Sequence, residues 1–235
     1  MTRKSILGFA PGRFIFVVAS MPALVACGVL TKQPWYEGLL AVYSVFTLMY
    51  LAEGRRAGPA CGIAFCLGYG ALFFSKQIYG LAAFNTLFGA PVYLASLIAW
   101  GRHMTVGDAV GSDRTVQAKK LTPGGWTLSL GASAAGFVGM YLLLRALNSQ
   151  AALWDSLTLS LVGPGLVLLL LRYVENWVFN LAGSAVVLVL WVINTIADTA
   201  NLNFILIAAL QTAVNAIGLV TWLRFERAGL ERKNA

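Results

Sequence analysis

Residues 177–197 read WVFNLAGSAVVLVLWVINTIA, a run of 21 residues without an Asp, Glu, Lys or Arg. A helix needs about 20 predominantly apolar residues to cross a bilayer, so this run predicts a membrane-spanning helix. The whole chain has the same character, because 59% of its 235 residues are hydrophobic and 11% are charged. A soluble domain carries about 25% charged residues. The composition therefore predicts an integral membrane protein and excludes a large catalytic domain outside the bilayer.

Seven further apolar stretches flank this run, each bounded by charged or turn-forming residues. The eight predicted spans are 14–31, 36–52, 60–75, 78–100, 126–147, 153–171, 177–197 and 202–223. Only the polar connection over 101–125 is long enough to form structure of its own. The expected fold class is all-α, an integral membrane protein of about eight transmembrane helices.

The basic residues predict how the helices are oriented. If the N-terminus is cytoplasmic, 14 of the 17 Lys and Arg residues fall in cytoplasmic segments, and only Lys32, Lys76 and Arg145 fall outside. Cytoplasmic loops of membrane proteins carry such an excess of positive charge. We therefore expect a multi-pass protein of the inner (plasma) membrane with both termini in the cytoplasm. Orientation in the lipid bilayer then explains the net charge of +8, and no nucleic-acid partner is expected.

The first span has two interpretations. Residues 24–27 read LVAC and are similar to the lipobox of a signal peptide, so cleavage before Cys27 would leave seven spans. The apolar run continues through Leu30, which favours a span that is retained. Both interpretations stay open at this point.

The order of the spans indicates an internal repeat. Aligning Trp100 with Trp222 places the fourth span on the eighth, and Arg55 before the third span pairs with Arg172 before the seventh. The second to fourth and the sixth to eighth spans each begin outside, and the fifth span resets the direction. This is a parallel 3+1+3 repeat, a plan that transporters use. The predicted segments are an N-terminal tail with an extra helix (1–34), a first three-helix bundle (35–100), a cytoplasmic loop (101–125), a linker helix (126–147), a second three-helix bundle (148–223) and a cytoplasmic tail (224–235).

Polar side chains inside a membrane are costly and usually face a cavity or a partner helix. Three spans carry uncharged amide, hydroxyl and aromatic side chains at helical spacing. The candidate ligand-binding residues are Asn85, Tyr93, Trp177, Asn180, Ser184, Gln211 and Asn215. Such a lining favours a neutral or singly charged small molecule with a flat ring. The alternative is that these side chains join helices through hydrogen bonds worth about 0.6–2 kcal/mol each.

Catalysis and metal chemistry find no support in the sequence. It contains no GxSxG, HExxH or P-loop pattern. His103 is the one histidine, and the three cysteines lie in apolar runs without a CxxC pair. We therefore expect no enzyme activity, no metal site and no cofactor.

Most tryptophans lie near the ends of predicted spans, where an interfacial aromatic belt would place them. This interpretation applies to Trp35, Trp100, Trp126, Trp154 and Trp222. Trp177 differs because it shares a helical face with Asn180 and Ser184. Replacing Trp177 is therefore expected to abolish function, whereas replacing Trp100 is expected to spare it.

Two segments of the second half resemble a known family. The sequence LWDS at 153–156 is followed, after one span, by RYVENW at 172–177. At the same spacing, the PnuC family of nicotinamide riboside transporters has W-D-S and R-K-Y-V-E-N-W. The sequence WYE at 35–37 resembles the family's W-x-E, and Gly218 with Trp222 resembles its closing G-x-x-x-W. The resemblance covers about residues 35–223.

The resemblance implies a SWEET-like 3+1+3 core with one extra N-terminal helix. It implies facilitated diffusion of nicotinamide riboside, imported for NAD synthesis without ion or ATP coupling and trapped by phosphorylation in the cytoplasm. A carrier of thiamine, riboflavin or a deoxynucleoside is an alternative. A membrane enzyme or assembly factor is an alternative from a different class. The oligomeric state stays open, with a homo-oligomer as one possibility.

Part of the candidate site departs from the family's pattern. Trp177 matches the family motif directly. Asn180 and Ser184 stand where the family commonly has Trp and then Asn or Asp, and Asn85 stands where it has Gln. These three residues are assigned by position alone. They are also where carriers of other vitamins would differ.

Overall fold

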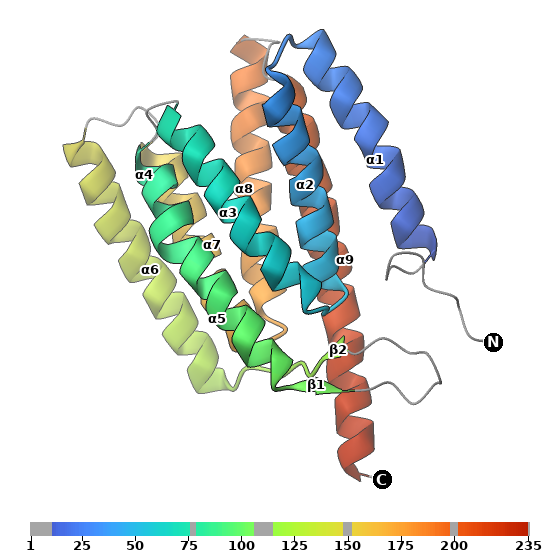
Figure 1. The fold of residues 1–235 in the computed structure, drawn as a ribbon. Helices are drawn as coiled ribbons and strands as arrows, with labels where there is room; N and C mark the ends of the chain where they lie inside the picture. The colour runs from blue at the N-terminus through green and yellow to red at the C-terminus, as the bar shows by residue number, and fades with distance from the viewer. Residues whose placement is uncertain (1–10, 76–78, 106–114, 148–151, 198–201, 235) are drawn as a thin grey trace.

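The computed structural model describes residues 11–75, 79–105, 115–147, 152–197 and 202–234. Within these ranges, eight helical segments are long and apolar enough to cross a membrane, which confirms the predicted all-α membrane fold (Figure 1). The helices are α1 (Pro11–Leu30), α2 (Trp35–Ala52), α3 (Ala57–Ser75), α4 (Tyr79–Ala83), the π-helix η1 (Phe84–Gly89), α5 (Ala90–Gly101), α6 (Pro123–Ala146), α7 (Ala152–Leu170), α8 (Asn176–Ala197) and α9 (Leu202–Asn234). The first span is one continuous helix through Cys27.

The fourth span is built from three pieces, α4, η1 and α5, because a π-helical turn interrupts it. Pro91 is the second residue after this turn and has no N–H to donate to the carbonyl four residues before it. The wider π-helical turn fits a position where this hydrogen bond cannot form. Such turns are frequent at functional sites. Hydropathy could not predict the interruption, since the run stays apolar throughout.

The last helix, α9, continues to Asn234 and passes through the segment predicted as a tail. Its final turns carry Arg, Glu, Ala and Leu, which favour helix in water as well as in lipid. In Figure 1 this extension protrudes at the end of the bundle where β1 (Met104–Thr105) and β2 (Thr115–Val116) lie. We call this the strap end.

The helices pack in two corresponding sets. In one set α2 packs on α3 and α3 on α5, and in the other α7 packs on α8 and α8 on α9. The sets pack on each other chiefly through α2 with α9 and through α5 with α7. In Figure 1, α1 and α6 lie at opposite edges of the bundle, where α1 contacts α2 and α6 contacts α7.

The helices α2 and α7 end in the same turn. Gly54 and Arg172 have φ angles of 64° and 68°, the left-handed conformation that terminates many helices. Gly54 N donates to the Leu51 carbonyl at 2.9 Å, and Arg172 N donates to the Leu169 carbonyl at 3.0 Å. The next residue in each case donates to the carbonyl five positions back, which completes a Schellman motif twice.

The predicted polar connection does form its own structure, because residues 115–121 bind both of these turns. We call this segment the strap. Val116 N donates to the Gly54 carbonyl at 2.9 Å, and Lys119 N donates to the Arg172 carbonyl at 2.8 Å. Val174 N donates back to the Lys119 carbonyl at 2.8 Å. The strap therefore ties the end of α2 to the end of α7 through main-chain atoms.

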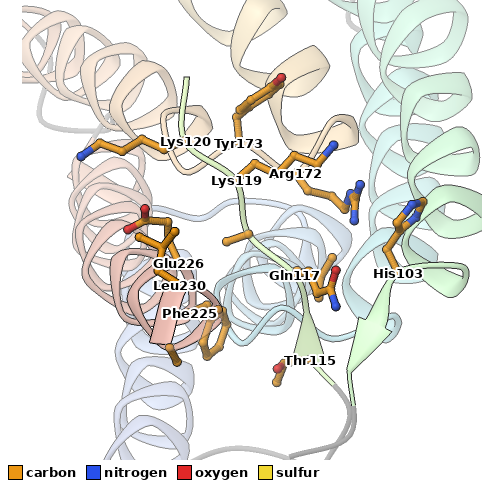
Figure 2. Close-up of a pocket in the computed structure, with 14 residues that line it drawn as sticks. His103, Thr115, Gln117, Lys119, Lys120, Arg172, Tyr173, Phe225, Glu226 and Leu230 are labelled. Carbon is orange, nitrogen blue, oxygen red and sulfur yellow. The ribbon is translucent and has the colours of Figure 1, made fainter. Parts of the chain in front are cut away.

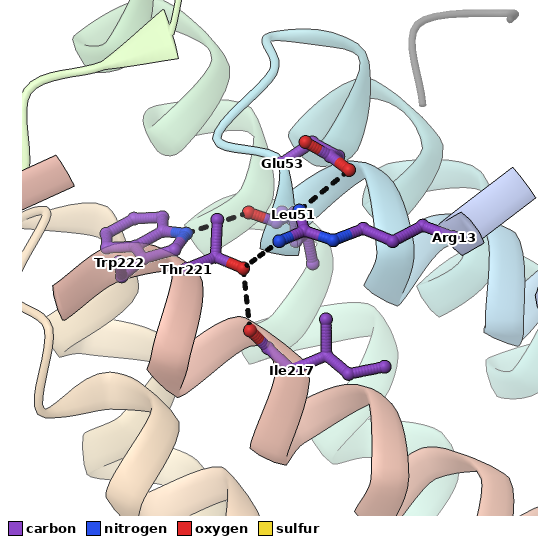
Figure 3. A network of polar contacts seen from close by, with 6 residues as sticks. All are labelled: Arg13, Leu51, Glu53, Ile217, Thr221 and Trp222. Carbon is purple, nitrogen blue, oxygen red and sulfur yellow. Dashed lines mark hydrogen bonds and ion pairs between the residues drawn. The ribbon is translucent and has the colours of Figure 1, made fainter. Parts of the chain in front are cut away.

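The extra helix α1 is also held at the strap end. Arg13 Nη1 lies 2.8 Å from Glu53 Oε1, and Arg13 Nη2 donates to Thr221 Oγ1 at 2.7 Å (Figure 3). A single side chain thus connects α1 with the end of α2 and with α9.

Replacing Arg13 by glutamine should lower the free energy of unfolding by about 1–3 kcal/mol, because hydrogen bonds to charged groups contribute this much when partly buried. Thermal unfolding of the purified protein measures the change. Arg145 on α6, an exposed side chain, supplies the matched control Arg145→Gln. Equal loss in the two variants would contradict the role given to Arg13.

Candidate functional site

Trp177 lies at the start of α8 and is 1% exposed. Its ring meets the Trp222 ring edge-on, with centroids 5.9 Å apart. A Cβ added at Gly218 would lie 2.4 Å from the Trp177 ring, so α9 can approach the indole only where it has a glycine. Gly218 and Trp222, the two ends of the G-x-x-x-W spacing, thus both contact the Trp177 ring.

Trp222 and Trp100 form a reciprocal pair between the two helix sets. Trp222 Nε1 donates to the Leu51 carbonyl of α2 at 3.1 Å (Figure 3). Trp100 Nε1 donates to the Leu169 carbonyl of α7 at 3.2 Å. The two rings lie 5.5 Å apart. The Leu51 carbonyl therefore accepts from both Trp222 and Gly54, and the Leu169 carbonyl accepts from both Trp100 and Arg172.

The predicted interfacial belt is wrong for these two tryptophans, since both are 0% exposed. A span end offers an indole two partners, the lipid headgroups or the free carbonyls of a neighbouring helix end. The position of a tryptophan in the sequence does not say which of these two partners its indole binds. Trp35, by contrast, is 79% exposed, as a belt residue would be. Trp100, Trp177 and Trp222 are called the tryptophan cluster below.

Three of the predicted polar residues come together within two turns of the cluster along α8 and α9. Asn215 Nδ2 of α9 donates to Ser184 Oγ of α8 and to the Asn180 carbonyl, both at 3.1 Å. Asn180 Nδ2 donates to the Asn176 carbonyl at 2.9 Å. The amide of Asn180 also lies against Gly165 of α7, where an added Cβ would meet it at 3.2 Å. The Asn215 Nδ2 group therefore joins α9 to α8, as expected if these polar side chains form hydrogen bonds between helices.

Three polar atoms of this region are buried without a hydrogen-bond partner among the described residues, Asn176 Oδ1, Trp177 Nε1 and Asn215 Oδ1. Trp177 packs on Gly218, and Asn215 lies three residues before it, on the same face of α9. A buried donor and a buried acceptor that stay unsatisfied cost about 1–3 kcal/mol each. Such groups are uncommon in native proteins, and a ligand or a second conformation is a physical reason to keep them.

The other predicted residues lie in different surroundings. Tyr93 is buried on α5, and its ring lies where a Cβ on Gly62 of α3 would meet it at 2.6 Å. Asn85 Nδ2 in η1 donates to the Leu81 carbonyl of its own helix at 2.8 Å. Gln211 is half-buried, one turn before Asn215 on α9. The structure therefore groups Trp177, Asn180, Ser184 and Asn215, while substrate binding by all seven residues stays a prediction.

Two cavities lie outside this polar region. The first, of about 830 Å³, lies at the strap end and is lined by the strap, the turn after α7 and the end of α9. The second, of about 570 Å³, is a mostly apolar groove between α3 and the α4–η1 segment. None of the seven predicted ligand-binding residues lines either cavity. Among the described residues, no group of three or more His, Cys, Asp or Glu is placed to hold a metal ion.

Eight candidate spans arranged as two corresponding helix sets, with a buried junction of tryptophans and amides between them, define a polytopic membrane protein of the transporter class. Residues 34–224 match the family model described as nicotinamide mononucleotide transporter, and the chain belongs to this family. It is therefore a transporter and not an enzyme.

Two relatives and one solved structure agree with this membership. The chain is 23% identical over 197 residues to the nicotinamide riboside transporter PnuC of Neisseria mucosa, covering 83% of this chain and 74% of the relative. It is 22% identical over 193 residues to the protein of the same name from Haemophilus influenzae, covering 81% and 83%. A crystal structure of the vitamin B3 transporter PnuC matches the fold with a TM-score of 0.80 at 20% identity, over 94% of each chain.

Proposed function

We propose that this protein carries nicotinamide riboside across the inner (plasma) membrane by facilitated diffusion, supplying the cell with a precursor of NAD. The names of the two relatives support the substrate, since both specify nicotinamide riboside. In this proposal the strap end faces the cytoplasm, as the basic residues predict. The two three-helix bundles, 35–100 and 148–223, rock about a site near the middle of the membrane, in the SWEET-like arrangement.

One observation carries the proposal, the junction of unsatisfied groups beside the tryptophan cluster. Within the described part of the chain, Trp177 Nε1 has no acceptor and Asn215 Oδ1 has no donor. A carboxamide presents one acceptor oxygen and two donor hydrogens, which complements this pair. The pyridinium ring of nicotinamide riboside is a flat cation, and such cations bind over tryptophan faces with about 0.5–2 kcal/mol. No carboxylate is needed for a ligand with one delocalised charge.

The tryptophan cluster closes the strap end in the conformation described. Opening it breaks two indole–carbonyl hydrogen bonds, worth about 0.5–1.5 kcal/mol each. It also separates the Trp100 and Trp222 rings, a pair worth about 0.5–1.5 kcal/mol. The total is a few kcal/mol, the range in which a minor conformation is about 0.1–10% populated. Thermal opening without ATP or an ion gradient is therefore energetically accessible.

Uptake of radiolabelled nicotinamide riboside into proteoliposomes tests the proposal, with calorimetric binding to the detergent-purified protein as a second measurement. We expect binding and saturable uptake that does not concentrate the substrate. Thiamine, riboflavin and a deoxynucleoside are measured in parallel. Response to one of these without response to nicotinamide riboside overturns the substrate. Absence of binding and uptake for the whole set overturns transport of this class of compound.

Replacing Trp177 by alanine should reduce uptake at least tenfold, because it removes the ring face and the free donor together. Trp35→Ala is the matched control, since that side chain is exposed. Trp100→Ala is not a control, because Trp100 lies in the same buried cluster. Trp177→Phe keeps a ring and removes only the donor, so an intact fold with weakened binding isolates the Nε1 group. Equal uptake by Trp177→Ala and Trp35→Ala would remove Trp177 from the site.

A further inference from the structure

The cavity at the strap end is lined by basic side chains from two elements that the proposed transport does not use. Lys119 and Lys120 come from the strap, and Arg172 comes from the turn after α7. In Figure 2 the ends of Lys119, Arg172 and His103 lie on one side of the strap. Glu226, the one acidic residue among those lining the cavity, lies on the other side with α9. One side of the cavity is therefore positively charged.

Arg172 is the unusual member of this group. Its side chain is 6% exposed, and it has no hydrogen bond or ion pair with any described residue. Burial lowers the pKa of its guanidinium, as removal from water disfavours the charged form. Arginine keeps its charge in proteins, so the side chain stays a cation that no described residue pairs.

The backbone at Arg172 makes this choice of residue more costly. Its φ of 68° is the left-handed conformation, which costs a residue with a Cβ about 1–2 kcal/mol. The corresponding turn after α2 has Gly54, which adopts the same φ without that cost. The turn itself therefore does not require arginine. A ligand that pairs this charge is a physical reason to keep a largely buried arginine at a strained position, since no described residue pairs it.

We propose that this cavity binds the phosphate group of a phosphomonoester, with Arg172 and Lys119 as its ligands. The planar fork of a guanidinium matches two phosphate oxygens, and an ammonium adds a second charge from another direction. The cavity volume of about 830 Å³ leaves space for an organic group beyond the phosphate. Phe225 supplies an aromatic wall for such a group. The site differs from the one proposed for nicotinamide riboside, since none of the tryptophan cluster lines this cavity.

Binding at this site would have a mechanical consequence. Lys119 belongs to the strap, and Arg172 belongs to the turn to which the strap is bonded. A phosphate held by both side chains adds a second connection beside the main-chain bonds. Any phosphomonoester that binds should therefore stabilise the closed strap end.

The full-length protein in an uncharged detergent, titrated with inorganic phosphate and with nicotinamide mononucleotide, tests this proposal. Chloride at equal ionic strength controls for screening. We expect saturable binding by calorimetry and a rise in unfolding temperature with either probe beyond the chloride control. Reconstitution with phosphatidylglycerol in place of phosphatidylcholine tests the lipid source of the same group. Stabilisation by the lipid alone would assign the site to a headgroup phosphate. No effect of phosphate, mononucleotide or lipid overturns the proposal.

Arg172→Gly is the decisive variant, because glycine suits the left-handed turn and preserves the main-chain bonds of the strap. We expect it to unfold at the same or a higher temperature than the parent without phosphate, and to bind phosphate at least tenfold more weakly. Lys119→Gln should weaken binding less, and Arg145→Gln on α6 should not change it. A lower unfolding temperature for Arg172→Gly without phosphate would make Arg172 structural and overturn the proposal. Unchanged phosphate affinity would do the same.

Discussion

Replacing Gly218 by alanine should reduce uptake at least tenfold and lower the free energy of unfolding by about 1–3 kcal/mol, the usual cost of overpacking a filled interior. The added Cβ would lie 2.4 Å from the Trp177 ring. Trp177 has little space to move, since its side chain is 1% exposed and also contacts the buried Trp222. The methyl group must therefore displace either α9 or the indole.

Gly139→Ala on α6 is the matched control, because a Cβ there meets no atom within 4 Å. In a helix interior, Gly→Ala is otherwise favourable by about 1 kcal/mol. The two substitutions should therefore change the unfolding temperature in opposite directions. Uptake and thermal unfolding of both variants provide the comparison. If Gly218→Ala is as stable and as active as Gly139→Ala, the close contact between Gly218 and the Trp177 ring does not exist in solution.

The double variant Trp100→Phe, Trp222→Phe should loosen the strap end by about 2 kcal/mol, since each substitution removes one indole donor worth about 1 kcal/mol. The Leu51 and Leu169 carbonyls keep their main-chain partners, so no buried acceptor is left unsatisfied. A change of this size raises the open population roughly 30-fold. Amide hydrogen exchange at Val116 and Lys119 should accelerate by a comparable factor.

Trp191→Phe controls for the loss of an indole elsewhere. Trp191 stacks on Phe204 with centroids 4.2 Å apart and lies far along α8 from the tryptophan cluster. We expect this variant to leave exchange in the strap unchanged. Each single variant of the pair should give an intermediate rate. Strap exchange in the double variant that matches the parent would show that the indole bonds do not hold this end closed.

The spans could be predicted from the sequence because the bilayer imposes one requirement on each of them, about 20 apolar residues in a helix. All eight spans were found in this way, with boundaries that differ by a few residues. The extension of α9 could not be found, since its charged residues end the apolar run without ending the helix. The π-helical turn was also missed, although Pro91 was a usable signal.

The candidate site was predictable in part for a different reason. Helical spacing correctly brought Asn180, Ser184 and Asn215 toward one another. Spacing does not say whether an amide faces a ligand or a neighbouring helix, because the same hydrogen bonds serve both. The pairing of Trp100 with Trp222 was visible as a repeat, yet their shared role depends on carbonyls of α2 and α7 that no side-chain pattern records. Arg172 was visible as a motif residue, while its left-handed backbone was not.

The strap holds the two turns through N–H and C=O groups, so its contacts with them depend on main-chain atoms. These bonds involve no side-chain atom of Val116 or Lys119, and proline is the residue that neither position can accept. Divergence can therefore proceed along the strap while the closure it makes persists.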